Sequence, residues 1–180
     1  MIEAASTLNF PNGIKIALTG FGRVGKGAAE LLDAVGVSQV DKVEFLSQEF
    51  EGGAVYAHLD IGDYNERKDG ADFDRVDFIK DPSSFRSCFL KYAKAADMFI
   101  AGHYYAEGSP YIITRDDLKN PDLRIKVVAD VSCDIDGPVA CTIRPSTVAE
   151  PLYGYNPKKE EECAFDAPGS ITVMLSLIHI

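Results

Sequence analysis

The first 36 residues combine an apolar run with a segment of helical periodicity. Residues 13–18 read Gly-Ile-Lys-Ile-Ala-Leu, which is typical of a buried parallel strand. From Gly22 onward, apolar residues recur at helical steps and share one face: Val24, Ala28, Leu31, Leu32 and Val35. Gly36 then favours the end of a helix, because glycine adopts the left-handed conformation without a side-chain clash. The pattern predicts a strand, a glycine turn and a helix.

Further apolar runs predict core strands at residues 43–46, 97–101 and 125–129. Between the first two of these, residues 48–81 are dense in Asp, Glu, Gly and aromatic residues and show no sustained period. This segment is interpreted as a surface insertion with at most one short strand, near residues 54–59.

Two further helices are expected in the second half of the chain. Residues 82–96 open with proline, follow a possible cap at Asp81, and carry apolar residues at helical spacing (Phe85, Phe89, Tyr92 and Ala96). A shorter helix is predicted at residues 114–118. Beyond Asp130 the chain is rich in loop signals until a last strand at residues 170–174.

The alternation of strands and helices predicts the fold class. Alternating elements are typical of a parallel sheet that is covered by helices on both faces. A length of 180 residues fits one domain. The expected fold is therefore an α/β, Rossmann-type, doubly wound parallel sheet in a single domain.

Charge and composition exclude several classes of protein. The chain has 28 acidic and 18 basic side chains, a formal charge of −10, and should repel nucleic acid and anionic lipid. The longest apolar stretch, residues 171–180, is too short to span a membrane. The first twelve residues lack the basic segment of a secretory signal. We expect a cytoplasmic protein without nucleic-acid or membrane partners, and the spacing of the four cysteines gives no support for a metal site.

The main chemical signal is a G-x-G-x-x-G motif between the first strand and the first helix. Its residues are Gly20, Phe21, Gly22, Arg23, Val24 and Gly25. The first glycine permits the tight turn, the second lets the backbone approach a pyrophosphate, and the third allows the helix to pack against the strand. The amides at the start of the helix then face the phosphates. These residues are the predicted binding site of a dinucleotide cofactor.

Cofactor choice depends on the end of the second strand. Enzymes that use NAD carry an acidic residue there, which binds the adenosine ribose. The predicted strand at 43–46 is followed by Ser47, and the spacing leaves open whether Glu49 reaches the ribose. Because residues 47–49 hold no basic side chain for a 2′-phosphate, NAD is expected and NADP is not excluded.

Polar residues follow two other predicted strands, at the edge where ligands of open α/β sheets bind. His103 and Tyr104 come after the strand at 97–101, and Asp130, Val131 and Ser132 come after the strand at 125–129, with Asp134 close behind. The pKa of one of these carboxylates is expected to be shifted if the bound cofactor excludes water from the cleft. The alternatives are an acidic surface loop for the aspartates and a structural role for His103.

Three segments carry a resemblance to a known family. They are I-A-L-T-G-F-G-R-V-G-K-G near the N-terminus, V-V-A-D-V-S-C-D-I-D-G-P at residues 127–138, and the following T-I-R-P-S-T-V-A-E-P-L-Y-G-Y-N-P. Together they resemble the cofactor domain of lysine-forming saccharopine dehydrogenases, a family related to alanine dehydrogenase and to the nucleotide domain of proton-translocating transhydrogenase. The resemblance implies oxidative cleavage of saccharopine to lysine and 2-oxoglutarate with NAD, or a similar reaction on an amino acid.

The resemblance also implies residue roles. The glycine motif would hold the pyrophosphate, and Asp130, Val131 and Ser132 would lie along the nicotinamide ribose. Asp134 matches an aspartate that stands beside the nicotinamide in the alanine-dehydrogenase relatives, so it is the candidate catalytic residue. Ser47 departs from the family's acidic ribose ligand.

In these families a separate N-terminal domain carries the acid–base groups and most contacts with the amino-acid substrate. The chain is accordingly expected to be truncated, with residues 1–12 as a linker, 13–174 as the dinucleotide-binding domain and 175–180 as a non-native tail. By itself it is expected to bind NAD weakly and to catalyse nothing. Two alternatives are a non-catalytic module that senses NAD and a methyltransferase that binds S-adenosylmethionine.

Overall fold

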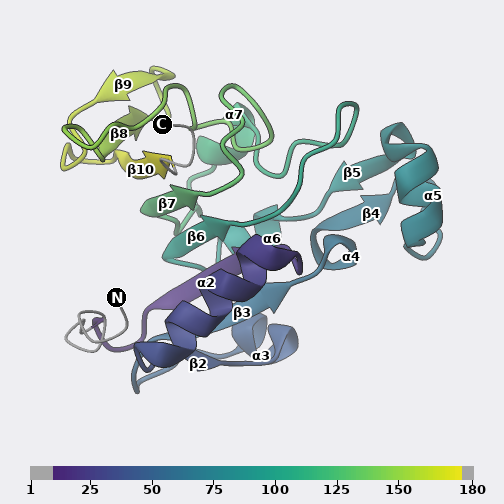
Figure 1. Cartoon of the computed structure of the whole chain (residues 1–180), viewed down its shortest axis with the longest axis horizontal. Coiled ribbons are helices and arrows are strands. Elements are labelled where there is room, and N and C mark those ends of the chain that lie inside the picture. The colour runs from purple at the N-terminus through teal and green to yellow at the C-terminus, as the bar shows by residue number, and fades with distance from the viewer. Residues whose placement is uncertain (1–9, 176–180) are drawn as a thin grey trace.

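The computed structural model describes residues 10–175, which form one large sheet with helices on both faces (Figure 1). The strands of this sheet, in spatial order, are β2 (Ser38–Gln39), β3 (Val55–Leu59), β1 (Lys15–Thr19), β6 (Met98–Ala101), β7 (Val127–Asp130), β10 (Ile171–Leu175), β8 (Tyr153–Asn156) and β9 (Glu161–Cys163). Neighbours from β2 to β10 pair in parallel, whereas β8 and β9 pair antiparallel. The α/β Rossmann-type fold is confirmed.

The predicted strand–turn–helix unit at the start of the chain is confirmed. Strand β1 is buried along its whole length, and helix α2 (Arg23–Ala34) follows directly after Gly22. Gly36 adopts a φ of +82° beyond the end of α2. The buried face of α2 differs in part from the predicted one, because Leu32 is buried but Leu31 is 53% exposed.

The predicted strand at residues 43–46 is wrong. These residues belong to helix α3 (Lys42–Ser47), which starts where the Asp41 carboxylate accepts a hydrogen bond from the Val43 amide at 2.7 Å. The apolar run is too short to distinguish a strand from one helical turn, and only Phe45 of α3 is buried. The strand beside β1 is instead β3, which pairs with it from Lys15↔Val55 to Thr19↔Leu59. The short strand expected near residues 54–59 is thus confirmed, but it lies second from the edge of the main sheet rather than in an insertion.

Two apolar layers hold the helices onto the sheet. On one face, Ile16 and Leu18 of β1 pack with Leu32 of α2. On the other face, Ala17 of β1 belongs to a larger cluster that includes residues of four helices, α3, α4 (Ile61–Tyr64), α6 (Leu90–Ala93) and α7 (Arg115–Leu118). Because successive side chains of a strand point to opposite faces, β1 contributes to both layers.

The real insertion lies later than predicted. It begins after the one-turn helix α4 (Ile61–Tyr64) and consists of β4 (Asn65–Arg67), α5 (Arg75–Lys80), the 3-10 turn η1 (Pro82–Ser84) and β5 (Phe85–Ser87). Strands β4 and β5 form a separate antiparallel pair, and the segment projects beyond the main sheet in Figure 1. The predicted helix over residues 82–96 is consequently wrong except for its last part, α6.

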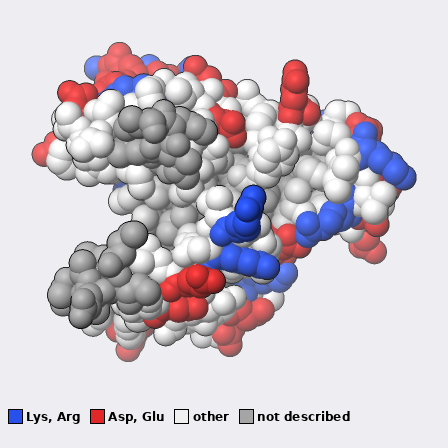
Figure 2. All heavy atoms as spheres, viewed as in Figure 1, with Lys and Arg blue, Asp and Glu red and all other residues white. Residues whose placement is uncertain are grey.

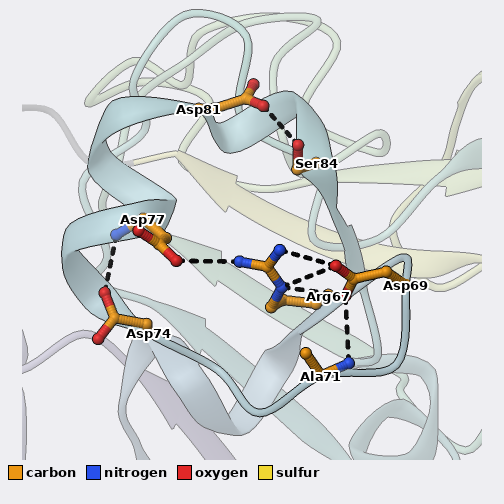
Figure 3. Close-up of polar contacts among 7 residues, drawn as sticks. All are labelled: Arg67, Asp69, Ala71, Asp74, Asp77, Asp81 and Ser84. Atoms are coloured by element: carbon orange, nitrogen blue, oxygen red, sulfur yellow. Dashed lines mark hydrogen bonds and ion pairs between the residues drawn. The ribbon is translucent and has the colours of Figure 1, made fainter.

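Ion pairs fix the insertion around Arg67 (Figure 3). The Arg67 guanidinium donates to Asp69 at 2.7 Å and to Asp77 of α5 at 3.0 Å. The Asp77 amide in turn donates to the Asp74 carboxylate at 2.8 Å, which caps the start of α5. The ion pair between Arg67 and Asp77 thus holds strand β4 to helix α5, and Phe78 of α5 packs on Phe85 of β5.

The C-terminal part contains more strand than predicted. The last strand is confirmed as β10, but β8 and β9 form a hairpin within a region interpreted as loop. The predicted helix at 114–118 is confirmed as α7, capped by Thr114, whose hydroxyl accepts from the Asp117 amide at 3.1 Å. Residues 1–9 of the expected linker and residues 176–180 of the expected tail at 175–180 lie outside the described residues, whereas Leu175 is the last residue of β10. Within residues 10–175, no helix is long and apolar enough to cross a membrane.

Candidate functional site

The glycine motif forms a tight turn between β1 and α2. Gly20 has a φ of +96°, and a Cβ atom there would lie 2.4 Å from the carbonyl oxygen of Gly102. At Gly25 a Cβ atom would lie 1.8 Å from the Gly20 carbonyl oxygen. Gly22 is different, because a Cβ atom would meet nothing within 4 Å. The first and third glycines are therefore required by close packing, whereas the second faces open space.

A histidine that the sequence analysis missed braces this turn. His58 of β3 donates from Nε2 to the Gly20 carbonyl oxygen at 2.6 Å. Its ring also stacks on Phe21, with ring centroids 3.9 Å apart and an angle of 12° between the planes. The alternation of β3 side chains could have indicated His58 only if residues 55–59 had been placed next to β1.

The N-terminus of α2 is suited to an anion. Its cap residue, Gly22, offers no side-chain hydrogen bond, and the first turn contains no acidic residue. Backbone amides at such a terminus lack intrahelical partners and carry a partial positive charge. Arg23 and Lys26 add basic side chains here, and Figure 2 shows Lys and Arg gathered over this end of α2. A phosphate group would find both amides and cations at this end of the helix.

An open groove of about 720 Å³ runs past the turn. It brings together nine of the predicted site residues, namely Gly20, Phe21, Gly22, Arg23, Val24, His103, Tyr104, Val131 and Ser132. They come from the ends of β1, β6 and β7, three neighbouring parallel strands. Ligands of open α/β sheets bind at this edge. Gly25 lies buried behind the groove, where the start of α2 contacts Gly20.

The groove also contains two charged residues that were not predicted as site residues, Asp60 and Arg75. Asp60 directly follows β3, the parallel neighbour of β1, and occupies the position where an acidic ribose ligand is expected. Ser47 was assigned to this position, but that assignment is wrong because Ser47 ends helix α3. Its hydroxyl donates to the Val43 carbonyl oxygen at 2.7 Å. Glu49 binds Arg124 at 3.0 Å and is absent from the groove lining.

His103 is buried at the base of the groove with one ring nitrogen unused. Its Nδ1 lies 2.9 Å from the Thr19 hydroxyl, whereas Nε2 makes no hydrogen bond to any described residue. Burial lowers the pKa of His103 to about 4, so the ring is neutral at pH 7. His103 and Tyr104 also line an adjoining apolar pocket of about 320 Å³. A buried polar atom without a partner is suited to a ligand hydrogen bond.

Asp130, the last residue of β7, holds the backbone on the β7 side of the groove in place. It is fully buried and accepts hydrogen bonds from the hydroxyls of Ser132 and Thr142, both at 2.6 Å. These contacts fix the backbone after β7, so that Val131 and Ser132 face the groove. Asp134 does not line the groove; burial and the nearby Asp130 carboxylate raise its pKa.

Comparisons with known proteins give a limited result. No protein-family model matches the chain, and no curated protein matches it. Among solved structures, the chain is similar to an L-alanine dehydrogenase, with 16% sequence identity and a TM-score of 0.43. The match covers 91% of this chain and 37% of the dehydrogenase. The chain thus spans little more than a third of that protein.

Proposed function

We propose that the groove binds a nicotinamide dinucleotide, with NAD preferred, as the cofactor domain of an oxidoreductase. The observation that carries this proposal is the bare N-terminus of α2, where Gly22 opens onto the groove and no side chain caps the helix. A glycine turn between a parallel strand and a helix is the usual cradle for a pyrophosphate. The basic residues at this helix end favour the same ligand, although the whole chain is acidic.

The two sides of the turn suit the two ends of such a cofactor. On the β3 side, the Asp60 carboxylate is 43% exposed and can accept hydrogen bonds from the hydroxyls of a ribose. The apolar pocket beside His103 suits a flat purine ring. On the β7 side, Val131 and Ser132 would lie along the nicotinamide ribose. The carboxylate at position 60 favours NAD over NADP, because it repels a 2′-phosphate.

When bound, the nicotinamide supplies hydride transfer, and the protein supplies binding and orientation. The proposed substrate class is an amino acid, as in the saccharopine and alanine dehydrogenases that the sequence resembles. Asp134 follows the groove residue Ser132 by two positions without lining the groove itself, and its proposed catalytic role is supported by the family resemblance alone. The substrate contacts and acid–base groups are proposed to come from a second domain, as the family resemblance implies.

Gly22 provides a sharp test, because its backbone has a φ of −75°, which any residue can adopt. Gly22→Asp should remove NADH binding, since the carboxylate would occupy the phosphate position and repel it. The same change should keep or raise thermal stability, because aspartate is a good helix cap. Gly22→Ala is the matched control and should bind NADH with moderate loss. Fluorescence titration that shows equal NADH affinity for Gly22→Asp and the wild type would refute the proposed site.

A further inference from the structure

An ion pair lines the groove on its proposed adenosine side. The Arg75 guanidinium lies 2.5 Å from the Asp60 carboxylate, and both side chains are about half exposed. Asp60 comes from the end of β3 in the main sheet, whereas Arg75 is the first residue of α5 in the insertion. Both line the groove together with the glycine turn. The pair therefore joins the insertion to the edge of the dinucleotide site.

The insertion holds Arg75 in a defined place. The Arg67 guanidinium is only 23% exposed and binds Asp77 on the first turn of α5 at 3.0 Å. Asp74 caps the same turn. Among the described residues, Asp60 is the only hydrogen-bond or ion-pair partner of the Arg75 side chain. The remaining donors of this guanidinium are thus free for a ligand.

Asp60 and Arg75 favour different groups at the 2′ position of the adenosine ribose. A carboxylate accepts hydrogen bonds from a free 2′-hydroxyl and repels a 2′-phosphate, whereas a nearby arginine accommodates the phosphate. Arginine recognises phosphate through a planar, bidentate fork. While the Asp60 carboxylate is paired with the Arg75 guanidinium, it repels a 2′-phosphate and also occupies a donor that the phosphate would need. A site with both residues therefore contains the chemistry for either cofactor.

We propose that Asp60 and Arg75 form a specificity switch for the 2′ position of the adenosine ribose. Asp60 binds the free hydroxyl and, by pairing with Arg75, withholds that cation from a 2′-phosphate. Removal of the carboxylate alone releases Arg75 and changes the preference from NAD(H) to NADP(H). This inference rests on the proposed function, because it concerns the same groove.

The test measures NADH and NADPH binding by fluorescence titration of the full chain, in the wild type and three variants. Asp60→Ser removes the charge and keeps a side chain that can cap α4. It should weaken NADH and strengthen NADPH, with a change of about 100-fold in the ratio of the two affinities. Asp60→Ser combined with Arg75→Gln should lose the gain for NADPH. Glu66→Ser is the control, because it breaks an ion pair with Arg86 on the insertion, outside the groove.

The outcomes separate this inference from the proposed function. A wild type that binds neither nucleotide would overturn both. A wild type that binds NADH, with Asp60→Ser giving no gain for NADPH, would overturn only the switch. The switch would also be refuted if the double variant kept the NADPH affinity of Asp60→Ser, or if Glu66→Ser changed the ratio to the same extent. Circular dichroism of each variant confirms that the comparison is made between folded proteins.

Discussion

The imidazole of His58 lies flat on the ring of Phe21, 3.9 Å away between ring centroids, while its Nε2 reaches the Gly20 carbonyl oxygen at 2.6 Å. A carbonyl oxygen only accepts hydrogen bonds, so Nε2 must carry the proton in this contact. One side chain of β3 thereby holds the first two residues of the glycine motif. The shape of the turn depends on its neighbouring strand as well as on its own glycines.

His58→Phe should keep the ring stack and lose the hydrogen bond to the turn. We expect a loss of about 1 kcal/mol in the free energy of unfolding, and weaker binding of NADH because the turn is less rigid. Urea denaturation and NADH titration measure the two effects. Unchanged NADH affinity in a variant that has lost stability would limit His58 to a structural role.

Gly25→Ala should damage the fold itself. The new Cβ atom would lie 1.8 Å from the Gly20 carbonyl oxygen, a distance that forces α2 away from β1. Overpacking of this kind costs about 3 kcal/mol or more. The control is Gly27→Ala, two residues later in the same helix, where nothing lies within 4 Å of the new atom. That control should be neutral or more stable by about 0.5–1 kcal/mol, because alanine is the better helix former. Equal melting temperatures for the two variants would contradict the packing described here.

His103 should make stability depend on pH. Burial lowers its pKa from the ordinary 6.5 to about 4 in the folded chain, so between these pH values the unfolded state binds a proton at His103 that the folded state does not. This contribution is fully present above pH 6.5 and is lost as the pH falls from 6.5 to 4, by about 3 kcal/mol in total. Urea denaturation of the wild type and of His103→Gln between pH 4 and pH 8 measures it. The variant should show a flatter profile; parallel profiles would mean that His103 is not buried neutral.

The sequence was most informative where structure is local. The glycine motif needs only a strand, a turn and a helix that are adjacent in the chain, and nine of the predicted site residues meet in one groove. The prediction failed where the pairing of strands that are distant in the sequence determines the structure. Residues 43–46 carry the same apolar run that a strand would, but Asp41 caps them as a helix and β3 takes the place beside β1. Ser47 was therefore assigned to the position that Asp60 occupies.

The bounds of the insertion were predicted wrongly for a related reason. Phe85 and Phe89 stand at helical spacing, yet Phe85 lies in β5 and packs on Phe73 and Phe78 of the insertion, while Phe89 packs on Phe99 of the main sheet. The spacing of apolar residues cannot show that two aromatic residues four positions apart pack in different hydrophobic clusters. The hairpin of β8 and β9 was not predicted because its strands are only four and three residues long and lie among turn residues.

The insertion leaves the domain and returns to it at one point, since Asn65 and Ser87 are paired residues of β4 and β5. Its removal would leave two chain ends that a short linker can join without disturbing the order of the main sheet. Such an appendage can be gained, trimmed or exchanged between related proteins independently of the scaffold. Arg75, the cation that it brings to the proposed cofactor groove, would then be acquired without any change to the glycine turn.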